Sequence, residues 1–160
     1  MGSPPGLESP AVAVDVLTEI EIERPREVVA AFATDPDNAP AWYANIQSVS
    51  WRTPRPATIG SQIEFHARFL GRTLVYTYEV RELTPGERLL MSTAQGPFPM
   101  ETSYEWKDAP GAATLMTLRN RGEPSGFSSL TAPVIERAMR RANRRDLARL
   151  KGLLERDRAS

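Results

Sequence analysis

Apolar and polar residues alternate in the first part of the chain that has a clear pattern. Between residues 12 and 23, one parity is apolar except for Thr18, and the other parity carries Asp15 and three glutamates. Alternation with a period of two predicts a strand with one buried face. We therefore expect a half-buried strand over residues 12–23, preceded by a disordered leader over residues 1–10 that is rich in Gly, Ser and Pro.

Two short helices are predicted after this strand. Pro25 suits the first turn of a helix, and apolar residues follow it at helical spacing, so we expect a helix over residues 25–33. Asp35 or Asp37 can cap a second short helix that carries Trp42 and Tyr43.

The middle of the chain shows repeated alternation separated by turn residues. We expect strands over residues 46–51, 63–69, 74–81, 89–93, 101–107 and 113–121, with a strong turn signal at Pro85-Gly86. The parities that we expect to face the core include Ile63, Phe65, Ala67, Phe69, Leu74, Tyr76, Tyr78, Val80, Thr102, Tyr104 and Trp106.

The last segment has a helical period. From residue 127 to residue 155 only Pro133 and Gly152 interrupt it, and proline is tolerated in a first turn. The expected apolar stripe consists of Leu130, Val134, Ile135, Ala138, Met139, Ala142, Leu147, Leu150 and Leu154. The opposite face carries Arg137, Arg140, Arg141, Arg144, Arg145 and Arg149.

This order of elements indicates an α+β fold in which a curved antiparallel sheet wraps around one long helix. The chain also resembles the START-like superfamily, known too as Bet v 1-like or SRPBCC, and within it the polyketide cyclase/dehydrase-like branch. The resemblance rests on the Pro25-x-x-Val28-x-x-x-Phe32 opening followed by Trp42, on residues 80–88 (Val-x-Glu-Leu-x-Pro-Gly-x-Arg), and on the long last helix. It implies a helix-grip fold in a single domain over residues 11–156.

Composition excludes several kinds of chemistry. The sequence has no cysteine and one histidine, His66, so thiol chemistry, disulfides and a two-histidine metal site within the chain are excluded. Motifs for nucleotide binding, zinc hydrolysis or a serine nucleophile do not occur. We expect no metal and no cofactor.

Charge is balanced overall but not along the chain. The 20 basic and 20 acidic residues cancel, which argues against general nucleic-acid binding. Residues 126–160 nevertheless carry nine basic and four acidic residues, a net of +5, so residues 1–125 carry −5. A solvated helix face explains this asymmetry, and docking to an acidic protein, RNA or anionic lipid is the alternative.

Few residues suit acid–base chemistry. Tyr76, Tyr78 and Tyr104 share the inward parity and can pack in the core or line a cavity, and Glu101 is a further candidate. His66 has a pKa near neutrality, but its parity directs it away from the core with Glu64.

The leading hypothesis is binding of a small hydrophobic ligand, similar to a lipid, a polyketide or an aromatic compound, between the sheet and the last helix. A polyketide aromatase/cyclase that acts in the same cavity is one alternative, and a docking module that uses the basic helix is another. The candidate lining comprises Trp42, Phe65, Phe69, Tyr76, Tyr78, Met91, Phe98, Met100, Tyr104, Ile135 and Met139.

Location and assembly are predicted only coarsely. The N-terminus lacks the basic and apolar regions of a signal peptide, and no apolar run is long enough to span a membrane, so we expect a cytoplasmic protein. An exposed Phe98 and Met100 on a stiff loop can form a gate or a dimer contact, and packing of Phe98 against the last helix is an equal alternative.

Overall fold

The structure is a computed structural model that describes residues 14–123 and 131–159. The expected leader over residues 1–10 and the first residues of the first strand lie outside these ranges. The elements in chain order are β1 Val14–Ile22, α1 Arg26–Thr34, the 3₁₀ turn η1 Pro36–Asn38, α2 Ala39–Trp42, β2 Ile46–Trp51, β3 Gln62–Phe69, β4 Arg72–Thr84, β5 Arg88–Gln95, β6 Met100–Ala109, β7 Ala113–Gly122 and α3 Ala132–Ala159.

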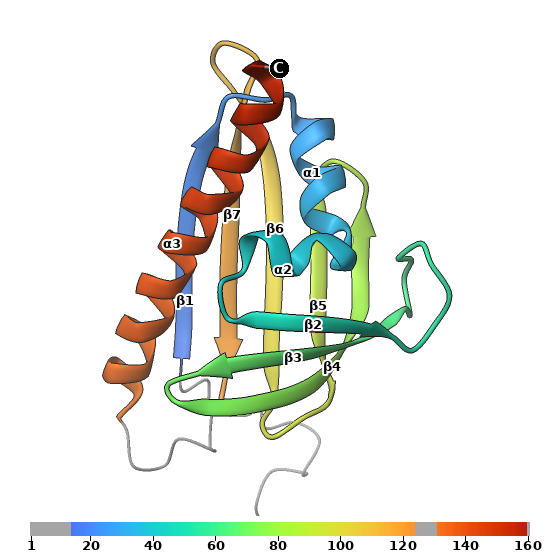
Figure 1. Cartoon of the computed structure of the whole chain (residues 1–160), viewed down its shortest axis with the longest axis vertical. Helices are drawn as coiled ribbons and strands as arrows, with labels where there is room; N and C mark the ends of the chain where they lie inside the picture. The colour runs from blue at the N-terminus through green and yellow to red at the C-terminus, as the bar shows by residue number, and fades with distance from the viewer. Residues whose placement is uncertain (1–13, 124–130, 160) are drawn as a thin grey trace, which may run out of the picture.

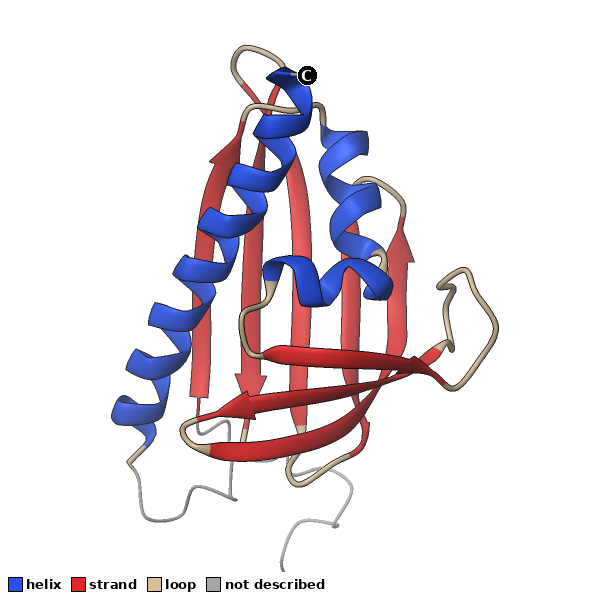
Figure 2. Ribbon diagram, in the orientation of Figure 1, coloured by secondary structure: helices blue, strands red, loops and turns tan. Residues whose placement is uncertain are grey.

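The strands form one seven-stranded antiparallel sheet in the order β1-β7-β6-β5-β4-β3-β2. Figure 1 shows that β2 and β3 run across the direction of β1, β5, β6 and β7, so the sheet curls strongly at one end. All three helices lie on the concave side, with α3 across β1 and β7 and with α1 and α2 in front of β5 and β6 (Figure 2). This arrangement is the helix-grip fold that the sequence predicts.

Alternation along the strands separates a buried inner face from a charged outer face. Val14, Val16 and Ile22 of β1 are buried, and Asp15 on the opposite face pairs with Arg119 of β7 (Oδ2 to Nη2, 2.6 Å). Arg88 similarly bridges Glu82 and Glu105 on the outer face. The expected strands are therefore present, and most extend by one to three residues beyond the predicted ends.

The N-terminal caps in the region of the two short helices differ from the prediction. Helix α1 follows Pro25 directly, but the side chain of Asp35 caps the 3₁₀ turn η1, where it accepts from the backbone N–H of Asp37 at 3.0 Å. No side chain caps α2, and Asp37 instead binds the Trp51 indole and Arg55. The consequence is that α1, η1 and α2 form one continuous bend that holds Trp42 against the sheet.

Helix α3 begins later than predicted and is not wholly apolar on its buried side. It starts at Ala132, and the predicted residues 127–130 lie outside the described ranges. Val134, expected in the apolar stripe, is 47% exposed because it lies on the solvent side of the first turn. The buried stripe also contains two polar residues, Asn143 and Asp146.

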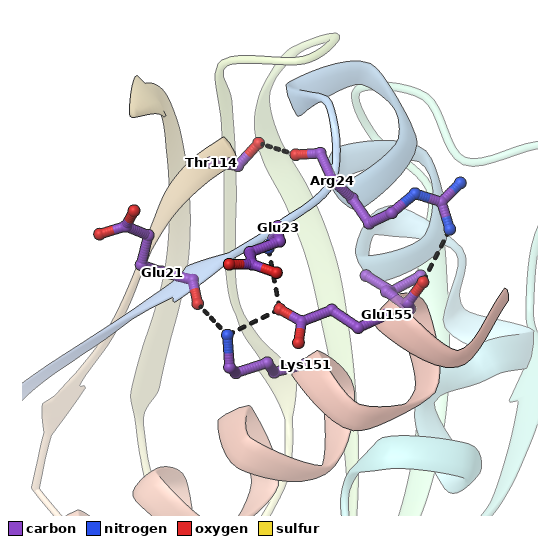
Figure 3. Close-up of polar contacts among 7 residues, drawn as sticks. Glu21, Glu23, Arg24, Thr114, Lys151 and Glu155 are labelled. Atoms are coloured by element: carbon purple, nitrogen blue, oxygen red, sulfur yellow. Dashed lines mark hydrogen bonds and ion pairs between the residues drawn. The ribbon is translucent and has the colours of Figure 1, made fainter. Parts of the chain in front are cut away.

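The C-terminal half of α3 is fastened to the connection between β1 and α1 (Figure 3). Lys151 donates to the carbonyl of Glu21 at 2.9 Å and to Glu155 at 2.6 Å, and Glu155 accepts from the backbone N–H of Glu23 at 2.9 Å. Arg24 donates to the carbonyl of Leu154 at 2.7 Å. These bonds fix one end of the helix, so that the other end extends beyond the short helices and over the inner side of the sheet.

Candidate functional site

A cavity of about 160 Å³ lies between the inner face of the sheet, the α1–α2 segment and α3. Its walls come from every strand between β2 and β7, from the loop before β6, and from Met139, Ala142, Asn143 and Asp146 of α3. One buried water needs roughly 10–15 Å³, so the cavity has room for on the order of ten waters or for a compact organic molecule.

Aromatic rings form two groups along the cavity wall. Trp42 packs on Tyr43 with ring centroids 4.0 Å apart and on Tyr104 at 5.8 Å. Across the cavity lining, Phe65 and Tyr78 lie 5.6 and 5.0 Å from the Tyr76 ring. Such walls provide large apolar contact area and rings on which a flat ligand can stack.

Two tyrosine hydroxyls meet at the α2 end of the cavity. The hydroxyls of Tyr43 and Tyr104 form a short hydrogen bond with each other. Desolvation raises the pKa of both phenols well above the ordinary value. Both groups are therefore neutral near pH 7, and they act as hydrogen-bond donors rather than as bases.

A chain of hydrogen bonds crosses the cavity lining from β4 to α3. The Tyr78 hydroxyl bonds Thr102 Oγ1 at 2.8 Å, Asn120 Nδ2 donates to the same Oγ1 at 2.8 Å, and Asn143 Nδ2 donates to Asn120 Oδ1 at 2.6 Å. Burial raises the pKa of Tyr78 to about 12, so this hydroxyl is neutral too. The network fixes the amide orientations of Asn120 and Asn143 and leaves Asn143 Oδ1 facing no donor among the described residues.

Asp146 places a carboxylate in the same lining. The residue is only 2% exposed, and its Oδ1 accepts from the backbone N–H of Ala44 at 3.1 Å. The nearest cation, Arg145 Nε, lies 3.9 Å from the same oxygen and is itself largely exposed. Desolvation raises the pKa of Asp146, and the bond from Ala44 and the charges of Arg145 and Arg149 oppose that rise.

Two donors in the lining lack partners within the described ranges. Trp42 is 1% exposed, and its indole Nε1 has no hydrogen-bond acceptor there. The Tyr76 hydroxyl likewise makes no hydrogen bond to the described residues, although burial raises its pKa well above normal. An unpaired buried polar group costs about 1–3 kcal/mol, which a partner outside the described residues would offset.

The structure brings together most of the residues that the sequence singled out. Ten of the eleven predicted lining residues contribute to the cavity wall, namely Trp42, Phe65, Phe69, Tyr76, Tyr78, Met91, Phe98, Met100, Tyr104 and Met139. Ile135 does not contribute to the wall, because it packs against Val14 and Leu74 in a second apolar cluster. Phe98 is half-buried against that cluster, which favours packing over a freely exposed gate.

Two acid–base candidates lie outside the cavity. Glu101 alternates with Met100 and Thr102, so its side chain lies on the outer face of the sheet, and the expectation that it can sit inside is wrong. His66 also lies on the outer face, where Nε2 is 2.8 Å from Glu64 Oε1.

The polar lining residues that were missed include Asn120, Asn143 and Asp146. The sequence did contain a signal for two of them. Residues 139, 143, 146 and 150 follow at steps of four, three and four, which places Asn143 and Asp146 on the apolar stripe between Met139 and Leu150.

The solvent side of α3 carries the basic residues. Five of the six predicted arginines are exposed there, namely Arg137, Arg141, Arg144, Arg145 and Arg149, and Arg140 is half-buried. Among the described residues, no helix is both long enough and apolar enough to cross a membrane. The same residues contain no group of three or more His, Asp or Glu side chains that could hold a metal ion.

Comparison with known structures supports the fold strongly. A START superfamily protein from Mycobacterium smegmatis superposes with a TM-score of 0.76 at 16% identity, over 89% of this chain and 97% of that one. A protein from Thermus thermophilus gives a TM-score of 0.73 at 19% identity, over 86% and 94%. The Zhui aromatase/cyclase from Streptomyces sp. R1128 gives 0.72 at 15% identity, over 89% and 93%.

At such low identities these likenesses establish the fold alone. No curated protein is significantly similar to the sequence. The family model described as "Polyketide cyclase / dehydrase and lipid transport" matches residues 13–155, which is nearly the whole chain. The chain therefore belongs to the polyketide cyclase/dehydrase and lipid transport family.

Proposed function

We propose that the protein binds a small, largely apolar ligand that contains an aromatic ring in the cavity between the sheet and α3. The observation that carries this proposal is the composition of the wall: stacked aromatic rings surround the space, and the polar side chains of Asn143 and Asp146 lie in the same lining. A mostly apolar, aromatic lining with a few polar side chains is typical of a small-molecule site. Membership of the family supports a ligand-binding role and leaves the ligand open.

A cavity-filling substitution tests the proposal. Ala142 lines the cavity from α3, whereas Ala148 of the same helix is exposed. We expect the neutral fluorescent probe N-phenyl-1-naphthylamine to bind the wild-type protein with a rise in emission. Ala142→Trp should weaken that binding at least tenfold because the indole occupies the space, and Ala148→Trp should leave it unchanged.

Comparison of the two variants distinguishes probe binding in the cavity from probe binding on the surface. Both variants place a tryptophan in the same helix, so helix propensity and added apolar area are matched. Equal binding by all three proteins would show that the probe binds elsewhere and would contradict the proposal. The absence of binding by the wild-type protein would contradict it equally.

A second candidate function is an aromatase/cyclase reaction on a poly-β-ketone. The observation that favours it is the presence of Asp146 and of the paired Tyr43 and Tyr104 hydroxyls in one buried lining. The neutral phenols can donate hydrogen bonds to a ketone oxygen, and the carboxylate can accept a proton from the carbon between two ketones. Ring closure with loss of water would then yield an aromatic product.

Product analysis distinguishes this enzyme from a binding protein. A linear poly-β-ketone is incubated with the wild-type protein, with Asp146→Asn and with Tyr104→Phe, and the aromatic product is followed by its ultraviolet absorption. Catalysis predicts a rate above that of buffer which both substitutions lower by at least tenfold. A rate equal to that of buffer would exclude the enzymatic alternative for this substrate and leave the binding proposal standing.

A further inference from the structure

Hydrogen-bond acceptors gather on one part of α3 that lines the cavity. Asp146 and Asn143 are three residues apart, so they lie on the same face of the helix. Asp146 Oδ1 accepts one bond from Ala44, and Asn143 uses only its Nδ2 in the network with Asn120. Within the described residues, Asp146 Oδ2 and Asn143 Oδ1 therefore have no donor, although both residues are more than nine-tenths buried.

Hydrogen-bond donors gather beside these acceptors. The Tyr43–Tyr104 contact uses one of two hydroxyl protons, because only one hydroxyl can donate in that bond. The second proton is left without an acceptor in the described chain. The Trp42 N–H also lacks an acceptor there, but its nitrogen is fully buried. Trp42 and Tyr43 directly precede Ala44, which itself binds Asp146, so these donors and acceptors belong to one region of the cavity lining.

The combination of donors and acceptors restricts the polar group of a ligand. An ammonium group only donates and would leave the free tyrosine proton unpaired, and a carboxylate only accepts and would be repelled by Asp146. A hydroxyl both donates and accepts. It can give its proton to the Asp146 carboxylate or Asn143 Oδ1 and accept from the tyrosine pair.

We propose that this polar region, made of Asp146, Asn143 and the Tyr43–Tyr104 pair, recognises the hydroxyl group of a phenol-like or hydroxylated aromatic ligand whose ring lies among the aromatic walls. The inference rests on the proposed binding function and adds the chemical class of the ligand. Asp146 is the specificity-determining residue in it, because a hydrogen bond to a charged acceptor is stronger than one to a neutral acceptor.

Three probes of similar shape test the assignment: 1-naphthol, 1-methylnaphthalene and 1-naphthylmethylamine. Their dissociation constants are measured near pH 7 by displacement of N-phenyl-1-naphthylamine. For the wild-type protein we expect 1-naphthol to bind about tenfold more tightly than 1-methylnaphthalene, as one charge-assisted hydrogen bond provides. The ammonium probe should bind more weakly than 1-naphthol.

Substitution assigns the preference to the carboxylate. Asp146→Asn keeps an acceptor for Ala44 and should weaken 1-naphthol binding about tenfold while leaving 1-methylnaphthalene within about twofold. Glu136→Gln, on the same helix but outside the cavity lining, should change neither value. Asn143→Leu supplies a second variant, which should also reduce the preference for 1-naphthol, and thermal unfolding confirms that each variant is folded.

The outcomes separate this inference from the function on which it rests. If 1-naphthol and 1-methylnaphthalene bind equally, or if Asp146→Asn and Asn143→Leu keep the preference, the inference is wrong and the binding function stands. Tighter binding of the ammonium probe would also overturn it in favour of a cationic ligand. If none of the probes binds, the proposed function and the inference both fail.

Discussion

Asp146 is a buried carboxylate whose ionisation opposes folding. Desolvation raises its pKa in the folded protein, so the folded state holds the proton at pH values where the unfolded chain has already lost it. The hydrogen bond from the backbone of Ala44 and the charges of Arg145 and Arg149 act in the opposite direction and lower the pKa. The destabilisation is complete above the folded pKa and vanishes below the unfolded value near 3.9.

This reasoning predicts that Asp146→Asn stabilises the protein at neutral pH. Asparagine keeps the shape and the acceptor for Ala44 but cannot ionise, so we expect Tm at pH 7 to rise by about 2–4 °C, the shift that about 1 kcal/mol gives in a chain of this size. The difference should shrink as the pH falls towards about 4. Calorimetry of both proteins across pH 4–8 measures it.

A lower Tm for Asp146→Asn at pH 7 would contradict this account. It would mean that the favourable contacts of the ionised carboxylate exceed the free-energy cost of its desolvation. Asp146 would then be a residue retained for stability. A gain in stability together with a loss of 1-naphthol affinity is the pattern of a residue retained for function.

At the scale of elements, α3 is held firmly at one end. Glu155 joins it to the backbone of Glu23 and pairs with Lys151, which also binds the carbonyl of Glu21 (Figure 3). We expect Glu155→Ala to lower the free energy of unfolding by about 1 kcal/mol, because it removes a backbone hydrogen bond and a partly buried ion pair. Urea denaturation measures the change.

Glu136→Ala is the matched control for this anchor. Glu136 lies in the first half of the same helix, so the two substitutions change helix propensity equally. Equal effects of Glu136→Ala and Glu155→Ala on the urea midpoint would show that the contacts at the C-terminal end add nothing to stability.

The strands were the most predictable elements, and the reason is local. In β6, Thr102, Tyr104 and Trp106 alternate with polar residues. This alternation predicts which side chains face the core, and these three are buried in the structure. Helix boundaries were less predictable, because Asp35 and Asp37 are both reasonable caps and only the tertiary bonds of Asp37 to Trp51 and Arg55 decide between them.

The cavity was predictable only in part. Its aromatic walls follow from strand parity, but its polar region depends on how α3 is rotated over the sheet. In the sequence, Asn143 and Asp146 only interrupt an apolar stripe. Their role becomes visible once the structure shows their hydrogen-bond partners, Asn120 and the backbone of Ala44. The prediction that Glu101 can sit inside the cavity was wrong for the converse reason. This carboxylate is close in sequence to lining residues but lies on the other face of the strand.

For the whole molecule, the zero net charge divides into an acidic body and a basic terminal region. We interpret the arginine face of α3 as a solvated surface, and we expect the protein to pass through a heparin column at roughly 0.15 M salt without delay. Retention that higher salt reverses would contradict this interpretation and support docking to an acidic partner.

The central claim concerns the whole fold: the sheet, the short helices and α3 enclose a binding site for a hydroxylated aromatic molecule. A crystal structure of the protein grown with saturating 1-naphthol tests it most directly. We predict the naphthalene ring between the walls that carry Phe65, Tyr76 and Trp42, with the hydroxyl oxygen within hydrogen-bond distance of Asp146. An empty cavity, or 1-naphthol bound only on the outer surface, would contradict the claim.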